Sequence, residues 1–198
     1  MKKTRPGGRS AQTRAAVYAA VEAILAEKEP SQVSMTEIAE RAGLAATSLY
    51  RRWGDVRTLM TEVAVERLMR DSPLPDTGLL RSDLNAWART VAAGLASREG
   101  SMFFRVYVGA APTSAEDGAG RSRALMRRIE QIAAMLDRAR ARGEPTPHVF
   151  EITDHLLAPL YMRALFGFPA DGEVAEGLVT YLLGVVEGRA NADSAQPV

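Results

Sequence analysis

Hydrophobic residues recur every three or four positions through most of this chain, which is the pattern of amphipathic α-helices. Near the N-terminus, Val17, Val21 and Ile24 fall on one helical face. Pro30 cannot continue a helix, because its ring fixes φ and it has no backbone N–H to donate. The pattern therefore predicts a first helix over residues 10–28.

Two short helices are predicted next. Ser34 is followed three residues later by Glu37, which is the spacing of a capping box, where each side chain accepts a hydrogen bond from the other residue's backbone N–H. Gly43 tolerates a positive φ and is expected to end this helix at Ala42. The helical pattern resumes over residues 45–53 and stops at the next glycine.

The rest of the chain is also predicted to be helical, so the expected fold class is all-α with about nine helices. A fourth helix covers residues 56–70, and the stretch DSPLPDTG at residues 71–78 forms a linker, because prolines and glycines end helices. A loop is expected from Ala111 to Gly120. The remaining helices are predicted at residues 84–95, 102–110, 125–136, 148–166 and 171–188.

The composition is that of a globular protein, with 46% hydrophobic and 25% charged residues. The chain has no cysteine, which excludes disulfides, thiolate metal sites and cysteine nucleophiles. No uncharged apolar run reaches the ~20 residues of a membrane helix, and the N-terminus lacks the apolar segment of a signal peptide. We therefore expect a cytoplasmic protein without a membrane partner.

Charge is distributed unevenly, although the formal net charge is only +1. Residues 1–70 hold 12 Lys and Arg against 8 Asp and Glu, which gives +4, and the remainder carries −3. Lys3 and Arg5 lie beside a proline and two glycines, so residues 1–9 are expected to form a flexible basic arm. The arm is either a solvated tail or a contact for a polyanion such as DNA.

The spacing between three residues, at positions 39, 43 and 49, indicates a helix-turn-helix. Ala39, Gly43 and Leu49 supply a small side chain where two helices cross, a residue tolerant of left-handed φ in the turn, and an apolar anchor under the second helix. A unit of this kind presents its second helix to the major groove of DNA. The alternative is an α-hairpin packed inside a helical bundle, but the polar and basic second helix favours DNA.

Side-chain chemistry suggests a role for each exposed position. Arg51 has the geometry for bidentate donation to guanine, and Thr47 can contact a thymine methyl. Arginine and hydroxyl groups nearby are predicted to hold phosphates, whereas Trp53 is assigned to the core. The predicted DNA contacts are Thr36, Ala46, Thr47, Ser48, Tyr50, Arg51, Arg52 and Arg57, with Lys3 and Arg5 of the arm.

The stretch SMTEIAERAGLAATSLYRRWGDVRTLM, residues 34–60, resembles the DNA-binding domain of the tetracycline-repressor (TetR) family. Two positions depart from the family's pattern. Ala45 stands where many members carry a serine that caps the recognition helix. Loss of this cap lowers the stability of the helix by about 1 kcal/mol. Val56 stands where many carry a phosphate-binding lysine, and the neighbouring Arg57 is a candidate replacement.

The second region resembles the family's ligand-binding and dimerisation domain through RARARGE at residues 138–144 and DHLLAPLYMRALFG at residues 154–167. The resemblance implies a homodimer formed through the last two helices, about residues 148–188, and a palindromic DNA operator. The domain division expected from all of this assigns a basic arm to residues 1–9, a DNA-binding domain to 10–55, a connecting helix and linker to 56–78, a ligand-binding and dimerisation domain to 79–190 and a disordered tail to 191–198.

An effector pocket is expected in the second region, because ligand pockets are apolar clefts with a few placed polar groups. Its candidate lining residues, which are equally compatible with ordinary core packing, are Trp87, Met102, Phe103, Tyr107, Tyr161 and Arg163. A ligand bound there would favour a dimer geometry that misaligns the recognition helices. The sequence does not name the effector, or separate a repressor from an activator or from a regulator without an effector.

Other functions have little support in the sequence. His148, Glu151 and His155 share a helical face, but a cap or surface role is favoured over a metal site, so we expect neither metal nor cofactor. Phosphate-binding glycine loops, HExxH and a serine with a partnering histidine are absent, so an enzyme is not expected. The remaining rival is a helical protein-interaction module, which unlike a DNA-binding protein would show little salt dependence.

Overall fold

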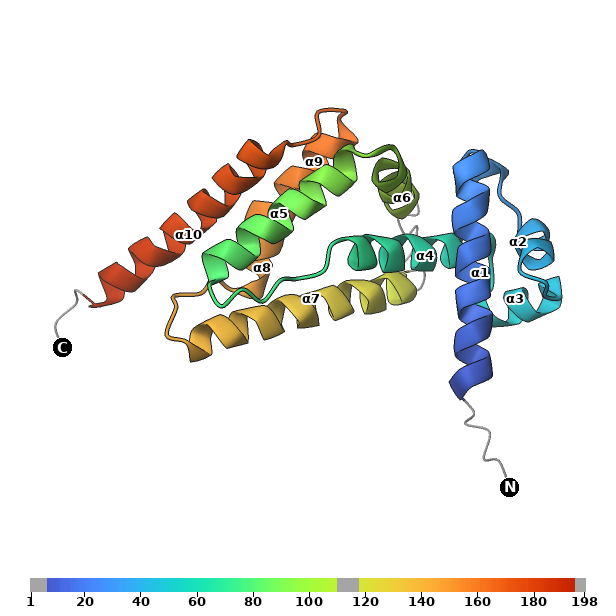
Figure 1. The fold of residues 1–198 in the computed structure, drawn as a ribbon, viewed down its shortest axis with the longest axis horizontal. Helices are drawn as coiled ribbons and strands as arrows, with labels where there is room; N and C mark the ends of the chain where they lie inside the picture. The colour runs from blue at the N-terminus through green and yellow to red at the C-terminus, as the bar shows by residue number, and fades with distance from the viewer. Residues whose placement is uncertain (1–6, 110–117, 195–198) are drawn as a thin grey trace, which may run out of the picture. The chain divides into compact units, whose positions relative to one another are not determined.

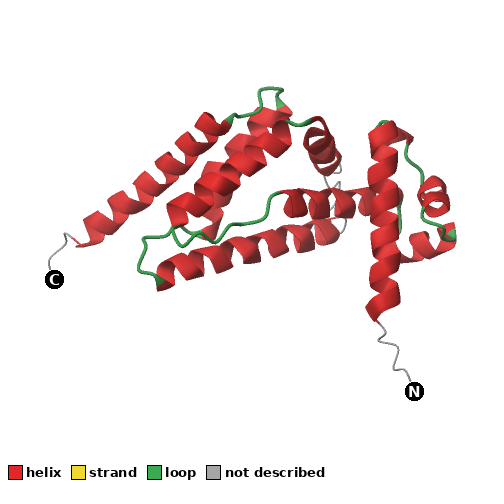
Figure 2. Ribbon diagram, in the orientation of Figure 1, coloured by secondary structure: helices red, strands yellow, loops and turns green. Residues whose placement is uncertain are grey.

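The computed structural model describes residues 7–109 and 118–194, and these residues form an all-α fold, as predicted (Figures 1 and 2). They divide into two compact units, one comprising the described residues 7–66, 106–109 and 118–121 and the other residues 67–105 and 122–194. The boundaries fall inside three helices: residues 67–71 of the fourth helix belong to the second unit, and residues 106–109 and 118–121 of two later helices belong to the first. The five-part domain division made from the sequence remains a prediction.

The first unit contains the N-terminal helices. Their bounds are α1 Gly7–Glu27, the 3₁₀ turn η1 Pro30–Gln32, α2 Met35–Arg41, α3 Ala46–Trp53 and α4 Val56–Asp71. Val17, Val21 and Ile24 are completely buried, as are Ile38 of α2 and Leu59 of α4. One apolar face of α1 therefore forms the centre around which the shorter helices pack.

The second unit contains the later helices. Their bounds are α5 Leu80–Ala96, α6 Arg98–Gly109, α7 Gly118–Ala141, α8 Val149–Ile152, the π-helical segment η2 Thr153–Leu157, α9 Ala158–Leu165 and α10 Gly172–Ser194. Within this unit α5 packs against α10 and α9 (Figure 1). Because α8, η2 and α9 are continuous, the described residues hold nine helical stretches, which agrees with the predicted number.

Several segments begin or end elsewhere than the sequence indicated. α1 begins at Gly7, so residues 7–9 of the expected arm are helical. Residues 118–120 of the expected loop belong to α7, while 110–117 lie outside the described residues. α10 extends to Ser194, four residues into the expected tail, because residues 189–194 include neither glycine nor proline. Extending an existing helix costs less than starting one, so helix ends extend past the amphipathic pattern.

The expected helix over residues 148–166 is interrupted by the wider π-helical segment. Pro159 has no N–H, and its ring would clash with the carbonyl of the residue four positions earlier, which is His155. Just before the proline, the Ala158 N–H donates to the carbonyl of Thr153, five residues back. The wider turn lets the helical path continue past the proline.

α6 begins four residues before its expected start at residue 102, because Ser97 caps it. The Ser97 hydroxyl accepts a hydrogen bond from the Gly100 N–H at 3.0 Å, which is the N-cap arrangement. Among the described residues, no helix has the length and apolarity needed to cross a bilayer.

Candidate functional site

The turn between α2 and α3 has the geometry that the Ala39, Gly43 and Leu49 spacing predicts. Ala39 is buried, and its carbonyl accepts a hydrogen bond from the Leu44 N–H at 2.9 Å. Gly43, between them, has φ +67°. This is a Schellman motif, in which a residue with left-handed φ closes the helix end.

The start of α2 shows one half of the expected capping box. The Ser34 hydroxyl accepts a hydrogen bond from the Glu37 N–H at 3.2 Å. The Glu37 carboxylate lies 2.7 Å from the ammonium group of Lys28, the residue that follows α1. Glu37 therefore ties α2 to the residue just after α1.

α3 is strongly amphipathic. Leu49 and Trp53 are buried at 1% and 7% exposure, which confirms the core assignment of Trp53. Thr47, Tyr50 and Arg51 lie on the exposed side of the same helix, and Tyr50 is 51% exposed. The helix thus packs through one apolar side and leaves a polar, basic side accessible.

The arginines predicted to contact DNA differ in their surroundings. The guanidinium groups of Arg51 and Arg57 are exposed and form no hydrogen bond or ion pair with any residue that the structure describes. Arg52 donates to the Ser10 hydroxyl at 3.0 Å and lies over the Trp53 ring. Arg52 therefore links the end of α3 to the start of α1.

The other predicted contacts are placed as follows. Thr36 is exposed on α2, and Ala46 and Ser48 are half-buried in the first turn of α3. Lys3 and Arg5 lie outside the described residues. All of these roles remain predictions.

The caps of α3 and α4 differ. Ala45 precedes α3 without a side-chain cap, as expected from its methyl group. Asp55, by contrast, caps α4 by accepting a hydrogen bond from the Thr58 N–H at 2.8 Å. The aspartate three residues before that N–H is the signal that the sequence contained.

A partly buried polar network joins α1 to α4, and no local pattern in the sequence indicates it. The Tyr18 hydroxyl donates a very short hydrogen bond to Glu62, 44 residues away, and accepts one from Arg14 at 2.7 Å. Arg14 also lies 2.9 Å from the Glu62 carboxylate. Burial, reinforced by the bond to Glu62, raises the pKa of Tyr18, so the phenol keeps its proton.

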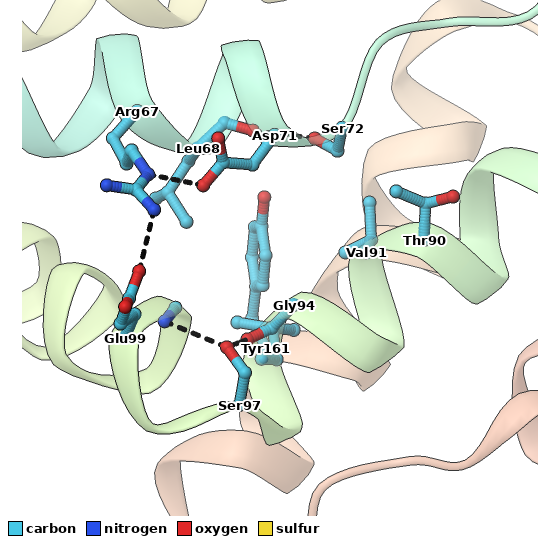
Figure 3. Close-up of a pocket in the computed structure, with 12 residues that line it drawn as sticks. Arg67, Leu68, Asp71, Ser72, Thr90, Val91, Gly94, Ser97, Glu99 and Tyr161 are labelled. Carbon is cyan, nitrogen blue, oxygen red and sulfur yellow. Dashed lines mark hydrogen bonds and ion pairs between the residues drawn. The ribbon is translucent and has the colours of Figure 1, made fainter.

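A cavity of about 80 Å³ lies within the second unit (Figure 3). Residues of α4, α5, α6 and α9 line it, and the wall combines leucine, valine and tyrosine side chains with charged groups. The lining residues are Arg67, Leu68, Asp71, Ser72, Thr90, Val91, Gly94, Leu95, Ser97, Glu99, Gly100 and Tyr161.

The candidate effector residues are only partly brought together. Tyr161 lines the cavity and stacks on Phe104 with ring centroids 5.1 Å apart. Trp87 and Phe103 are fully buried core residues, Met102 is half-buried, and Arg163 is exposed. The sixth candidate, Tyr107, belongs to the other unit. Pocket lining by this set remains a prediction.

Arg128 is only partly exposed, although it lies on α7, a helix rich in arginine. Its guanidinium lies 5.1 Å from the Trp87 ring centroid and donates to the Ser72 carbonyl at 2.9 Å and to the Ser72 hydroxyl. Burial lowers the pKa of Arg128 from its usual value. Periodicity on α7 could not reveal this environment, because it is created by residues of α5 and the segment after α4.

The two histidines near α8 lie in ordinary surroundings. The His148 N–H donates to the Glu151 carboxylate at 2.7 Å, and this carboxylate also pairs with Arg189 at 2.8 Å. His155 contacts the edge of Tyr181. Among the described residues, no cluster of three metal-ligating side chains occurs.

The last helices expose several large apolar side chains. Phe166 and Phe168 in the α9–α10 turn are 66% and 74% exposed, and Tyr181 of α10 is 62% exposed. The other members of this group are Phe150, Met162, Leu165 and Val185. Together we call these seven residues the C-terminal apolar face.

An all-α chain with a helix-turn-helix that presents a polar, basic second helix belongs to the class of DNA-binding transcriptional regulators. The family of bacterial regulatory proteins called tetR matches residues 17–63, and the tetracyclin repressor-like C-terminal domain matches residues 74–182. The chain is a member of the TetR family of transcriptional regulators. It is a regulator and not an enzyme.

Similar proteins of known class support this family membership. The chain is 30% identical over 157 residues to the HTH-type transcriptional regulator AqdR of Rhodococcus erythropolis, covering 79% of this chain and 73% of that protein. It is 28% identical to the uncharacterized HTH-type transcriptional regulator YdeS of Bacillus subtilis, covering 83% of each. The solved TetR family transcription regulator SCO0332 shares the fold with a TM-score of 0.76 at 28% identity, over 87% of this chain and 97% of that one.

Proposed function

We propose that the protein is a repressor that binds a palindromic operator as a homodimer and is released by a small-molecule effector. The exposed polar side of α3 carries this proposal, since Thr47, Tyr50 and Arg51 are accessible on a helix whose opposite side is buried. Arg51 and Thr47 read base edges, and Arg57, Tyr50 and Arg52 hold phosphates. Because its target is DNA, we place the protein in the cytoplasm.

The C-terminal apolar face supports the homodimer. Monomers rarely expose large contiguous apolar areas, and seven large apolar side chains of α8–α10 and their connecting turns are exposed. We propose that residues 148–188 pair with their counterparts around a two-fold axis. Such a dimer sets two recognition helices ~34–36 Å or a multiple apart and requires a palindromic site.

The cavity in the second unit supports release by an effector. Ligand sites are concave and mostly apolar with a few polar groups, and the cavity wall has this composition. An effector releases DNA only if it binds better to a dimer geometry in which the recognition helices do not match the operator.

Selection from random double-stranded DNA at about physiological salt tests the DNA-binding proposal, with the retained molecules sequenced. We expect one palindromic motif. Its affinity should fall steeply with salt, because neutralised phosphates release counterions. Binding without sequence preference, or a motif without two-fold symmetry, would contradict the dimeric operator, and salt-independent binding of protein partners alone would favour an interaction module.

A further inference from the structure

We propose that the cavity bounded by α4, α5, α6 and α9 binds a small organic carboxylate near the end of α4, held by Arg67 of the cavity wall and attracted by Arg128 of α7, which lies behind Ser72. The inference names the chemical class of the effector and so rests on the proposed function. Ligand binding can be measured without DNA, so the carboxylate proposal and the proposed DNA-binding function can be refuted independently.

Two guanidinium groups meet the cavity wall at consecutive residues. Arg67 lies 2.5 Å from the Asp71 carboxylate, and Arg128 donates to both oxygens of the next residue, Ser72. Asp71 and Ser72 both line the cavity. The two guanidinium groups therefore lie near one end of the cavity, and the rest of the wall combines apolar side chains such as Leu68 with Thr90, Ser97 and Glu99.

Arg128 is a partly buried cation without a carboxylate partner. Its contacts are the Trp87 ring, Ser72 and Gln131, and no Asp or Glu among the described residues forms an ion pair with it. Cations removed from water are normally paired with an anion, because desolvation is costly. An anion at the Ser72 end of the cavity would provide that pairing.

Arg67 is paired, but one of its partners can be exchanged. The Arg67 side chain is only 20% exposed, whereas Glu99, 2.8 Å away on α6, is 70% exposed. Figure 3 shows the Arg67 guanidinium between Asp71 and Glu99. A ligand carboxylate can replace Glu99 at Arg67 and let Glu99 turn into solvent, where it is well hydrated.

Displacement of Glu99 from Arg67 would leave the site short of one negative charge. On the wall, Arg67 is balanced by Asp71 and Glu99, and Arg128 adds a positive charge behind Ser72. Once Glu99 has been displaced, two arginines face one carboxylate, and a ligand carboxylate restores neutrality. Arginine suits this role because its planar fork bonds both oxygens of a carboxylate.

The volume and the apolar wall limit the rest of the ligand. About 80 Å³ holds roughly five to eight water-sized groups, at ~10–15 Å³ each. Val91 and Leu95 of α5 and the ring of Tyr161 surround this space. The body of the ligand is therefore a single ring or a short aliphatic chain.

Isothermal calorimetry of the full-length protein with benzoate and benzamide tests the proposal, because the two probes share shape and differ in charge. We expect benzoate to bind about tenfold or more tightly than benzamide, as charge-assisted hydrogen bonds predict. Arg67→Gln should remove this preference and leave benzamide binding unchanged. Glu99→Gln should strengthen benzoate binding several-fold, since it removes the competing carboxylate, a result that a purely structural role for the Arg67–Glu99 pair would not give.

Two variants complete the design. Arg89→Gln removes an exposed ion pair with Glu176 within the same unit and should leave both probes unaffected. Val91→Phe fills the cavity and should abolish benzoate binding, whereas Ala93→Phe adds the same ring on the exposed side of α5 and should not. Circular dichroism verifies folding of each variant.

Equal binding of the two probes, binding that survives Val91→Phe, or no benzoate binding at millimolar concentration overturns the carboxylate proposal. If the same protein sample still binds a palindromic operator, the proposed DNA-binding function stands. Benzoate binding that leaves operator affinity unchanged upholds the ligand class and contradicts release.

Discussion

Three arginines with the same side-chain chemistry have different surroundings in the structure. Arg51 and Arg52 are neighbours on α3 with the same chemistry, yet only Arg51 is without a partner among the described residues, while Arg52 bonds Ser10. Arg128 lies on a helix rich in arginine and packs on a buried tryptophan. Side-chain type limits what an arginine can do, but its neighbours select the role.

At this scale we predict different losses for Arg51→Ala and Arg57→Ala. Removing Arg51 should weaken binding by ~1–3 kcal/mol at one operator position and relax specificity there, because a bidentate contact to a base is lost. Removing Arg57 should weaken binding to all DNA sequences alike, because a phosphate contact is lost. It should also reduce the slope of log affinity against log salt concentration by about one.

Binding titrations against the selected operator and its single-base variants, at several salt concentrations, give the measurement. Thr58→Ala, next to Arg57 but uncharged, is the control for disturbance of α4, and it should leave the salt slope unchanged. An equal loss for Arg51→Ala on every base variant would remove its base-reading role.

At the scale of elements, helix ends are fixed by single side chains that come from near or far. Asp55 and Ser97 cap helices that start within three residues of them. The α5 N-terminus is capped across 64 residues, because the Leu80 N–H donates to the Glu144 carboxylate at 2.8 Å. Arg142 also lies 2.8 Å from Glu144.

We predict that Glu144 makes stability depend on pH in the acid range. The Leu80 hydrogen bond, with Arg142, lowers the pKa of Glu144 in the folded protein. A lowered folded-state pKa means that the stabilisation is present above the unfolded value of about 4.3 and is lost as pH falls through the folded value.

Urea unfolding of Glu144→Ala between pH 7 and pH 3 measures this effect. At pH 7 the variant should be about 1 kcal/mol less stable than the natural chain, which is the usual effect of losing a helix cap, and the difference should shrink as pH falls. Glu130→Ala removes an exposed carboxylate of α7 without a partner among the described residues and should show no such trend. A pH-independent difference for Glu144→Ala would contradict the prediction.

At the scale of the whole molecule, the decisive question is assembly. The C-terminal apolar face comprises residues from positions 150 to 185, and the proposed two-fold dimer covers it. A charge placed on this face would be buried without a partner, which disfavours association.

We therefore predict that Tyr181→Glu converts the dimer to a monomer at micromolar concentration and weakens operator binding, while α1–α3 stay folded. Sedimentation equilibrium and circular dichroism measure the two effects. Leu79→Glu changes a side chain of similar exposure, 61%, outside the apolar face and should remain dimeric. A dimeric Tyr181→Glu variant would exclude this face as the interface.

The helices and the helix-turn-helix could be predicted from the sequence, because they depend on interactions between residues close in the chain. Periodicity located every helical stretch, and Ala39, Gly43 and Leu49 located the turn through local backbone preferences and one packing contact. Even the errors at α1 and α10 were displacements of helix ends, where extending a helix by a turn changes the free energy little.

Only the tertiary structure decided which polar residues meet. The Tyr18–Glu62 hydrogen bond spans 44 residues and the Arg128–Ser72 contact spans 56, and no local pattern specifies such pairs. The same holds for the cavity, because its wall combines side chains from four helices. By itself the sequence determined the helical elements and the surface proposed to contact DNA. Tertiary packing determined the partners of the partly buried charges and the shape of the cavity, since both depend on residues brought together from distant parts of the chain.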